Sequence, residues 1–360
     1  MTVTPAATLV DAPVDVRVTG LAPRESVALQ ATTKDYLGKL WRGRRAVRAD
    51  AHGVYDSHGD MRLFWSLQCV NRALNCYLGP ALGPTDVDID VLRAGRAVGR
   101  GVLSRRGVAA DVTTTAMTLA HDGVFGTYFA PPRGSSPAPA VMVIGGSEGG
   151  YAPYPAALLA SHGYPALAVA YFKEPGLPAA LENIPLEYFQ TALRRLAAQP
   201  GVDPKRLVVL GTSRGGEASL LIGSAFPDLV RGVIALVPSD QVNPGFPDNS
   251  KPAWTLGGKA VPYGQIAVEK IAGPVLALGG AKDYIWDSSG AVERIVDRAR
   301  ARGREDVVGV VYPQAGHGLS YVANMPPVLV GELGGTDEGN ERAQTASWAR
   351  TLRFLAALGK

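Results

Sequence analysis

Cysteine and aromatic residues are scarce in this chain of 360 residues, which has two cysteines and 7% aromatic side chains. Cys69 and Cys76 lie seven residues apart, and no set of metal-ligand residues is spaced around them. Two isolated cysteines argue against a disulfide framework and favour reduced thiols in a cytoplasmic protein. We expect no metal site, and no motif indicates a cofactor.

Long hydrophobic runs and concentrated charge are also missing. No apolar segment reaches membrane-spanning length, and residues 1–15 lack the basic and apolar regions of a signal peptide. The net charge is only +4, and the arginine-rich stretches 42–45 and 298–302 have no interleaved aromatic residues. We therefore expect a soluble protein that acts on a small molecule and binds neither nucleic acid nor membrane.

The first hundred residues have the pattern of short β-strands. Residues 14–18 alternate with period two, residues 26–32 resume the alternation, and residues 62–67 form a further β-like run. Short strands separated by glycine turns are typical of an all-β sandwich. A Gly- and Arg-rich stretch, residues 93–107, has the composition of a linker. The sequence therefore predicts a first domain over residues 1–106 and a second over 107–360.

In the second part, apolar strands alternate with amphipathic helices. After an expected hairpin over residues 113–129, the predicted strands are 140–145, 166–171, 206–210, 232–237, 274–278 and 307–312. The predicted helices are 156–162, 186–198, 218–226, 291–302 and 343–358. This alternation indicates an α/β domain with a mostly parallel sheet covered on both faces. Ligands in such sheets bind beyond the carboxyl ends of the strands.

The pattern G-x-S-x-G occurs where the strand at 206–210 meets the next helix, at Gly211, Ser213 and Gly215. In the nucleophile elbow of α/β-hydrolases, a tight strand-to-helix turn of this kind exposes the serine hydroxyl above the sheet. A turn that happens to hold serine between glycines has the same pattern. The functional interpretation therefore depends on finding partners for Ser213.

A serine hydroxyl needs a base, and histidine has a suitable pKa near neutrality. His317 directly follows the final predicted strand, at the sheet edge where Ser213 is expected. The other histidines are in loops of the first domain, in the hairpin turn or at a helix end: His52, His58, His121 and His162. We therefore predict His317 as the base, although a histidine in a surface turn is the simpler alternative.

The imidazole in turn needs an acid that orients it. Asp283 follows the strand at 274–278 and is the first candidate. Asp240 follows the preceding strand and is the second candidate. Asp287 is the third, because it is better placed to cap the next helix. The order Ser, Asp, His along the chain is that of the α/β-hydrolases.

An oxyanion hole needs two backbone N–H groups near the nucleophile. One is expected from Arg214, the residue after Ser213, and the other from the glycine-rich loop 145–150, through Ser147 or its neighbour Gly146. A phosphate cradle is the alternative for this loop, but the spacing G-x-G-x-x-G and a following Gly-Lys-Ser/Thr are missing.

Several longer stretches resemble the acyl-CoA thioesterase and bile acid-CoA:amino acid N-acyltransferase family. They are residues 16–23, 29–35 and 63–67 in the first part, and 182–189, 210–217, 281–286 and 312–317 in the second. The resemblance runs from about residue 14 to the C-terminal helix. It implies an Ig-like N-terminal domain followed by an α/β-hydrolase domain, with Ser213, Asp283 and His317 as the triad.

The family resemblance also implies the reaction, which is cleavage of an acyl thioester through an acyl-serine. Amino-acid-conjugating members of the family carry cysteine at the nucleophile position, so Ser213 favours hydrolysis. Residues 68–107 and 240–268 are shorter than in the family, and the loop 145–150 lacks the family's aromatic-glycine run. We therefore expect a serine hydrolase for an acyl-CoA-like substrate. The alternatives are an acyltransferase or cyclase with a non-water acceptor, a dienelactone-type ester or lactone hydrolase, and a binding protein with an inactive elbow.

Overall fold

A computed structural model describes residues 1–35, 37–71, 82–134, 136–151, 153–320, 323–327 and 330–359. The chain divides into two compact units. Met1–Ala109 and Tyr321–Leu329 form the first unit, and Ala110–Ser320 and Val330–Lys360 form the second. The division after Ala109 lies close to the predicted boundary after residue 106. No sequence signal indicated that residues 321–329 group with the first unit.

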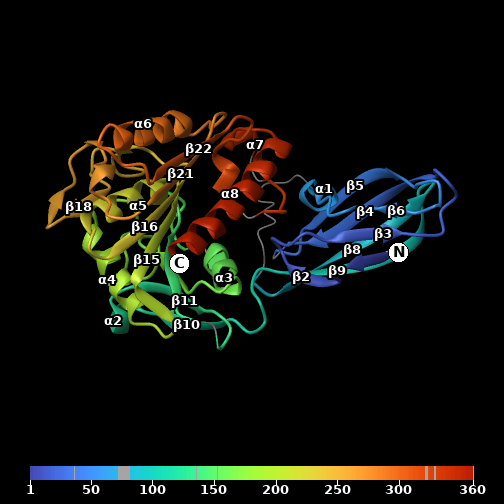
Figure 1. Cartoon of the computed structure of the whole chain (residues 1–360), viewed down its shortest axis with the longest axis horizontal. Coiled ribbons are helices and arrows are strands. Elements are labelled where there is room, and N and C mark those ends of the chain that lie inside the picture. The colour runs from blue at the N-terminus through green and yellow to red at the C-terminus, as the bar shows by residue number, and fades with distance from the viewer. Residues whose placement is uncertain are drawn as a thin grey trace. The chain divides into compact units, whose positions relative to one another are not determined.

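Two sheets form the first unit (Figure 1). The smaller sheet has the order β1-β3-β6, with β1 (Thr2–Thr4), β3 (Asp15–Val18) and β6 (Tyr55–Asp56). The larger has the order β2-β9-β8-β4-β5-β7, with β2 (Ala7–Leu9), β9 (Arg96–Arg106), β8 (Pro84–Arg93), β4 (Ser26–Lys34), β5 (Leu40–Arg48) and β7 (Gln68–Cys69). Alternate side chains of β4, namely Val27, Leu29 and Ala31, are buried, as expected for a strand with one face on a core. The prediction of an all-β sandwich is confirmed.

The expected linker at residues 93–107 is wrong, because most of this stretch is the strand β9. It pairs antiparallel with β8 along its whole length, after a turn at Ala94 and Gly95, which both have positive φ angles. Only Leu103 and Arg105 of the strand are buried. Because β9 is held by backbone hydrogen bonds and buries few side chains, its residues can be as polar and glycine-rich as those of a loop. Composition alone therefore did not reveal the strand.

Two further expectations for the first unit are wrong. Residues 62–65 form a short helix, α1 (Arg62–Trp65), and not a strand. The pattern of a short apolar run does not distinguish a helix from a strand. Cys69 takes part in a disulfide bond and is not a free thiol. Cys76 lies outside the described residues. The cysteine content therefore no longer supports the prediction of a cytoplasmic protein.

The second unit is built on a sheet of eight strands in the order β10-β11-β13-β12-β15-β16-β21-β22. The strands are β10 (Thr113–Met117), β11 (Phe125–Ala130), β12 (Ala138–Ile144), β13 (Ala166–Ala170), β15 (Val202–Thr212), β16 (Val230–Leu236), β21 (Val275–Gly280) and β22 (Val307–Tyr312). From β13 to β22 all neighbours are parallel, whereas β10 and β11 form an antiparallel hairpin around the short helix α2 (Leu119–Asp122). The α/β-hydrolase prediction is confirmed.

Helices cover both faces of this sheet (Figure 1). In that view α3 (Pro153–Ser161) and α8 (Asp337–Leu358) lie on one side, and α4 (Leu186–Ala197) and α5 (Arg214–Ala225) lie on the other. The remaining helices are α6 (Ser288–Arg300) and α7 (Val330–Leu333), with the 3-10 turns η1 (Val268–Lys270) and η2 (His317–Ser320). Helix α5 begins at Arg214, four residues before the predicted start, because Gly215 and Gly216 weaken the helical pattern in the sequence.

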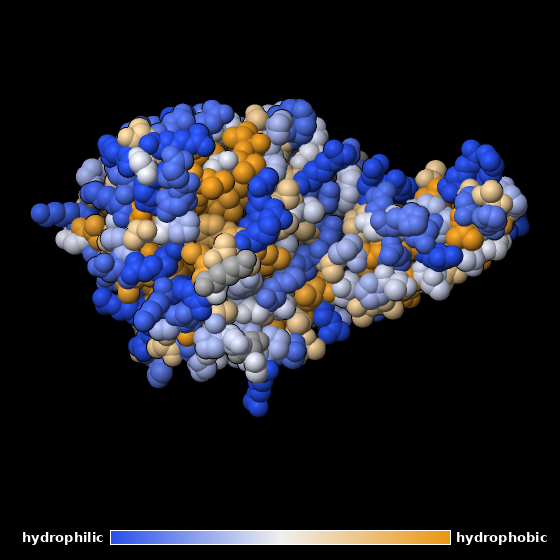
Figure 2. Space-filling view, in the orientation of Figure 1, coloured by the Kyte–Doolittle hydropathy of each residue, from blue (hydrophilic) through white to orange (hydrophobic). Residues whose placement is uncertain are grey.

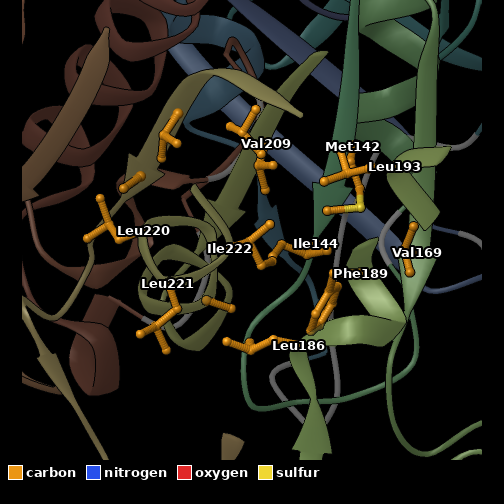
Figure 3. Packing of buried hydrophobic residues seen from close by; sticks show 14 of the residues in the cluster. Met142, Ile144, Val169, Leu186, Phe189, Leu193, Val209, Leu220, Leu221 and Ile222 are labelled. Atoms are coloured by element: carbon orange, nitrogen blue, oxygen red, sulfur yellow. The ribbon is translucent and has the colours of Figure 1, made fainter. Parts of the chain in front are cut away.

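The main core fills the space between the sheet and helices α4 and α5. Figure 3 shows Met142, Ile144 and Val209 of the strands packed toward residues of these helices. Phe189 of α4 and Ile222 of α5 are completely buried there. This packing fixes α5 against β15, so the turn between them has a rigid support on both sides.

A segment of short strands follows β16. It contains β17 (Gln241–Val242), β18 (Trp254–Leu256), β19 (Lys259–Ala260) and β20 (Gly264–Gln265). Strand β17 pairs with β20, and β18 pairs with β19 and with β14 (Ile184–Pro185), which directly precedes α4. We call residues 241–265 the cap segment, because the family resemblance implies a cap over the acyl pocket in this region.

Candidate active site

Ser213 forms the turn between β15 and α5. Its φ angle is 58° and its ψ angle −119°, which is a backbone conformation that residues other than glycine rarely adopt. The Ser213 N–H donates to the Leu236 carbonyl of the neighbouring strand β16 at 2.9 Å. The turn therefore holds a strained residue at the carboxyl edge of the sheet, as expected for a nucleophile elbow.

Close backbone approaches explain the glycines on either side of Ser213. A Cβ atom at Gly211 would lie 1.9 Å from the Gly215 carbonyl oxygen. A Cβ atom at Gly215 would lie 2.3 Å from the Gly145 carbonyl oxygen. Any larger residue would therefore push the turn apart.

We expect Gly215→Ala to lower the free energy of unfolding by about 3 kcal/mol, because the new methyl group overlaps backbone atoms that cannot move freely. Gly331→Ala is the matched control, since a Cβ atom there meets no atom within 4 Å. Urea denaturation followed by circular dichroism measures both variants. Equal stability of Gly215→Ala and wild type would show that the turn is less tightly packed than its geometry indicates.

The structure brings Ser213, His317 and Asp283 together. His317 Nε2 lies 2.8 Å from Ser213 Oγ, and His317 Nδ1 lies 2.8 Å from Asp283 Oδ2. The second carboxylate oxygen of Asp283 accepts from the backbone N–H groups of Ile285 and Trp286 at 2.9 and 3.2 Å. The side chains of Asp283 and His317 are only 1% and 10% exposed. These contacts orient the carboxylate toward the imidazole and the imidazole toward the hydroxyl.

The two other candidate acids have different partners. Asp240 is buried and accepts from Arg294 Nη2 and Nε at 2.9 and 3.1 Å. Asp287 caps helix α6 through the N–H of Gly290, as expected, and also pairs with Arg294. Asp283 is thus the candidate acid that lies against His317.

Trp286 belongs to the same cluster, although sequence reasoning gave it no role. Its ring packs edge-on against the His317 imidazole, with ring centroids 5.6 Å apart. Its indole N–H donates to the Val237 carbonyl at 3.0 Å. The indole thus limits the rotation of the histidine. Its position three residues after Asp283 was the available sequence signal.

The glycine-rich loop 145–150 follows β12 and passes beside Ser213. A Cβ atom at Gly146 would lie 3.2 Å from the Cβ of Ser213 and 2.7 Å from Glu148 Oε2. In this structure the Gly146 N–H donates to Glu148 Oε1 at 3.1 Å. Of the three backbone N–H groups predicted for the oxyanion hole, that of Gly146 is therefore already hydrogen-bonded to a side chain of its own loop.

Two side chains from the residues that directly follow β13 hold this loop. The Tyr171 hydroxyl lies 3.0 Å from the carbonyl oxygens of both Gly145 and Gly146. Burial raises the pKa of Tyr171, so the phenol stays protonated and donates to these carbonyls. Lys173 Nζ donates to the Glu148 carbonyl at 2.8 Å. Sequence reasoning did not identify either side chain.

Apolar surface lies next to the candidate acid. Tyr284 and Ile285 are 68% and 52% exposed, although they are large and apolar. Figure 2 shows further apolar surface on the second unit, bordered by hydrophilic side chains. Exposed apolar surface beside a cluster of polar groups is typical of a ligand site.

Among the described residues, no group of three or more His, Cys, Asp and Glu side chains could hold a metal ion. Likewise, none of the helices in that part of the chain is long and apolar enough to cross a membrane.

The sequence matches two models of one family. Residues 11–118 match the acyl-CoA thioester hydrolase/BAAT N-terminal region. Residues 184–251 and 255–358 match the BAAT/acyl-CoA thioester hydrolase C terminal.

Similar curated proteins are acyl-CoA thioesterases. Acyl-coenzyme A thioesterase 6 of Mus musculus is 28% identical over 392 residues, covering 96% of this chain and 93% of the mouse protein. Acyl-coenzyme A thioesterase 1 of Rattus norvegicus is 28% identical over 400 residues, with the same coverage. The peroxisomal succinyl-coenzyme A thioesterase of Mus musculus is also 28% identical, over 396 residues.

Similar solved structures share the fold. A dienelactone hydrolase-like promiscuous phosphotriesterase from metagenomic libraries has a TM-score of 0.51 at 18% identity, covering 70% of this chain and 100% of the other. The α/β-hydrolase MGS-M1 from a deep-sea metagenome library has a TM-score of 0.51 at 17% identity, covering 69% and 99%. At this identity the likeness shows the α/β-hydrolase fold alone.

Proposed function

Because the chain belongs to the acyl-CoA thioester hydrolase/BAAT family, we propose that it hydrolyses acyl-CoA thioesters through an acyl-serine at Ser213. The observation that carries this proposal is the continuous hydrogen-bonded row from Ser213 through His317 to Asp283. An imidazole placed between a hydroxyl and a carboxylate is the arrangement that activates a serine nucleophile.

In the first half-reaction, Ser213 Oγ attacks the thioester carbonyl carbon as its proton passes to His317 Nε2. The carbonyl oxygen becomes an oxyanion that accepts from the backbone N–H of Arg214 and from an N–H of the loop 145–150. The carbon–sulfur bond then breaks, and His317 returns the proton to the thiolate. Asp283 keeps the Nδ1 proton of His317 in place throughout, which leaves Nε2 free to accept.

In the second half-reaction, His317 Nε2 takes a proton from water, and the resulting hydroxide attacks the acyl-Ser213 carbonyl. The carboxylic acid leaves, and Ser213 Oγ regains its proton from His317. The exposed apolar side chains of Tyr284 and Ile285, beside Asp283, support an acyl group as the substrate part bound near the triad. Serine at the nucleophile, in place of cysteine, supports water as the acceptor.

A panel of acyl-CoA substrates tests this proposal. We expect free thiol and carboxylic acid to appear in equal amounts, and mass spectrometry of quenched enzyme to find the acyl group on the peptide with Ser213. Added amines and alcohols should leave the product unchanged. An amide or ester product would instead establish an acyltransferase, and turnover of esters or lactones without thioesters would establish an ester hydrolase.

A further inference from the structure

Glu217 is a buried carboxylate that the proposed mechanism does not use. It lies in the first turn of α5, four residues after Ser213, and its backbone N–H donates to the Ser213 carbonyl at 3.0 Å. Its side chain is 0% exposed. A carboxylate this deeply buried is stabilised only by several donors, so its partners indicate its purpose.

Four hydrogen-bond or ionic contacts converge on the carboxylate. Oε1 accepts from the Trp254 indole N–H at 2.7 Å and from the Asn243 backbone N–H at 3.0 Å. Oε2 accepts from Asn243 Nδ2 at 3.0 Å and lies 3.3 Å from Arg214 Nη1. Glu217 therefore joins the cap segment, through Asn243 and Trp254, to the residue that follows the nucleophile.

Arg214 is held at the same junction. Its side chain is 8% exposed, and Nη2 donates to the Asn243 and Pro244 carbonyls at 3.2 and 2.8 Å. The guanidinium carbon lies 5.8 Å from the centroid of the Trp254 ring. The arginine is thus clamped between α5 and the cap segment.

We propose that Glu217 is a positioning residue that fixes Arg214, so that the Arg214 backbone N–H is preorganised to bind the oxyanion. This role rests on the proposed function, because it assigns the Arg214 amide to the oxyanion hole. Burying an ion pair is a poor way to gain stability, since apolar side chains of similar volume often serve as well. What the charged junction provides is one fixed orientation of the arginine, and small displacements of a catalytic group cost large factors in rate.

Glu217→Gln tests the role. The glutamine carbonyl oxygen can still accept from the Trp254 indole and the Asn243 backbone N–H, whereas the amide nitrogen loses the ionic contact with Arg214 and the hydrogen bond from Asn243 Nδ2. Glu187→Gln is the matched control. Glu187, in α4, accepts from the Gly257 N–H through Oε1 at 2.6 Å and so contacts the same cap segment at a residue other than those that Glu217 and Arg214 contact. The primary measurement is the rate at which a fluorophosphonate modifies Ser213, since this reaction needs the nucleophile and the oxyanion hole but no acyl-CoA.

We expect Glu217→Gln to slow phosphonylation and kcat by about ten- to a hundred-fold, and Glu187→Gln to change either by less than about two-fold. A non-hydrolysable thioether analogue of palmitoyl-CoA, which forms no oxyanion, should bind wild type and Glu217→Gln with equal affinity. If phosphonylation were slowed equally in Glu217→Gln and Glu187→Gln, Glu217 would serve only to anchor the cap segment, and the proposal would be overturned.

A second variant guards against failure to fold. Arg214→Met with Glu217→Met removes both charges together and leaves no unpaired ion. If it is folded by circular dichroism and modified as fast as wild type, the proposal is wrong; slow modification supports it. If the wild type is phosphonylated at Ser213 but hydrolyses no acyl-CoA, the proposed substrate is wrong. The phosphonylation rates of the variants would still decide the role of Glu217. Wild type that is not modified at all would refute both.

Discussion

Replacing Ser213 with alanine is expected to lower kcat for thiol release from acyl-CoA by about 10⁴- to 10⁶-fold, because the Ser213 hydroxyl forms the acyl-enzyme in the proposed mechanism. Ser213 Oγ lies 2.8 Å from His317 Nε2, and the alanine methyl group cannot replace that contact. Release of thiol can be followed with a chromogenic disulfide, and mass spectrometry of quenched samples should find no acylated peptide.

Ser224→Ala is the matched control for this variant. Ser224 lies near the end of α5, the helix that begins directly after Ser213, and its hydroxyl donates to the Leu221 carbonyl at 3.0 Å. Its removal should leave kcat within about two-fold of wild type. Both proteins should unfold at the same temperature as wild type to within about two degrees, since neither change alters the core. Rapid turnover by Ser213→Ala would rule out the acyl-serine mechanism.

Asp283→Asn is expected to reduce kcat by about 10⁴-fold, even though the side chain keeps its shape. The amide nitrogen donates where the carboxylate accepted, so the His317 ring takes the tautomer with its proton on Nε2. The Ser213 hydroxyl then has no acceptor. KM should change little, because Asp283 lies behind the histidine and does not touch the acyl group in the proposed mechanism. Steady-state kinetics over several acyl-CoA concentrations separate the two parameters.

Asp240→Asn provides the comparison, because Asp240 was the second candidate acid. Its carboxylate pairs with Arg294, which is 45% exposed, so the change should lower the free energy of unfolding by about 1–3 kcal/mol. Its kcat should stay within about two-fold of wild type at a temperature where the variant is folded. If Asp240→Asn lost activity and Asp283→Asn kept it, the assignment of the acid would be reversed.

The order of elements in the second unit could be predicted because it depends on local patterns. Residues 140–145 and 206–210 are apolar throughout, which is typical of strands buried on both faces, and Ser213 stands in a recognisable five-residue pattern. The sequence also placed Asp283 and His317 after two successive predicted strands. It could not show that the two side chains meet, because that depends on strands far apart in the chain being neighbours in the sheet.

The expectations that were wrong concern features that composition does not determine. Residues 93–107 have the composition of a linker, but backbone hydrogen bonds to β8 make most of them a strand. Two cysteines alone indicated reduced thiols, whereas Cys69 is disulfide-bonded in the structure.

By itself, the sequence determined the two-part organisation, the α/β-hydrolase fold and the candidate triad. Hydrophobic periodicity and tight turns depend on residues that are close together in the chain, so they can be recognised without the structure. Only the tertiary structure decided which acid faces His317, that Glu148 engages the Gly146 amide, and that Glu217 joins Arg214 to the cap segment. In each of these contacts, a side chain meets a group that the folding of the chain brings close to it. Distances of that kind are set by how the elements pack and not by the pattern within any one of them.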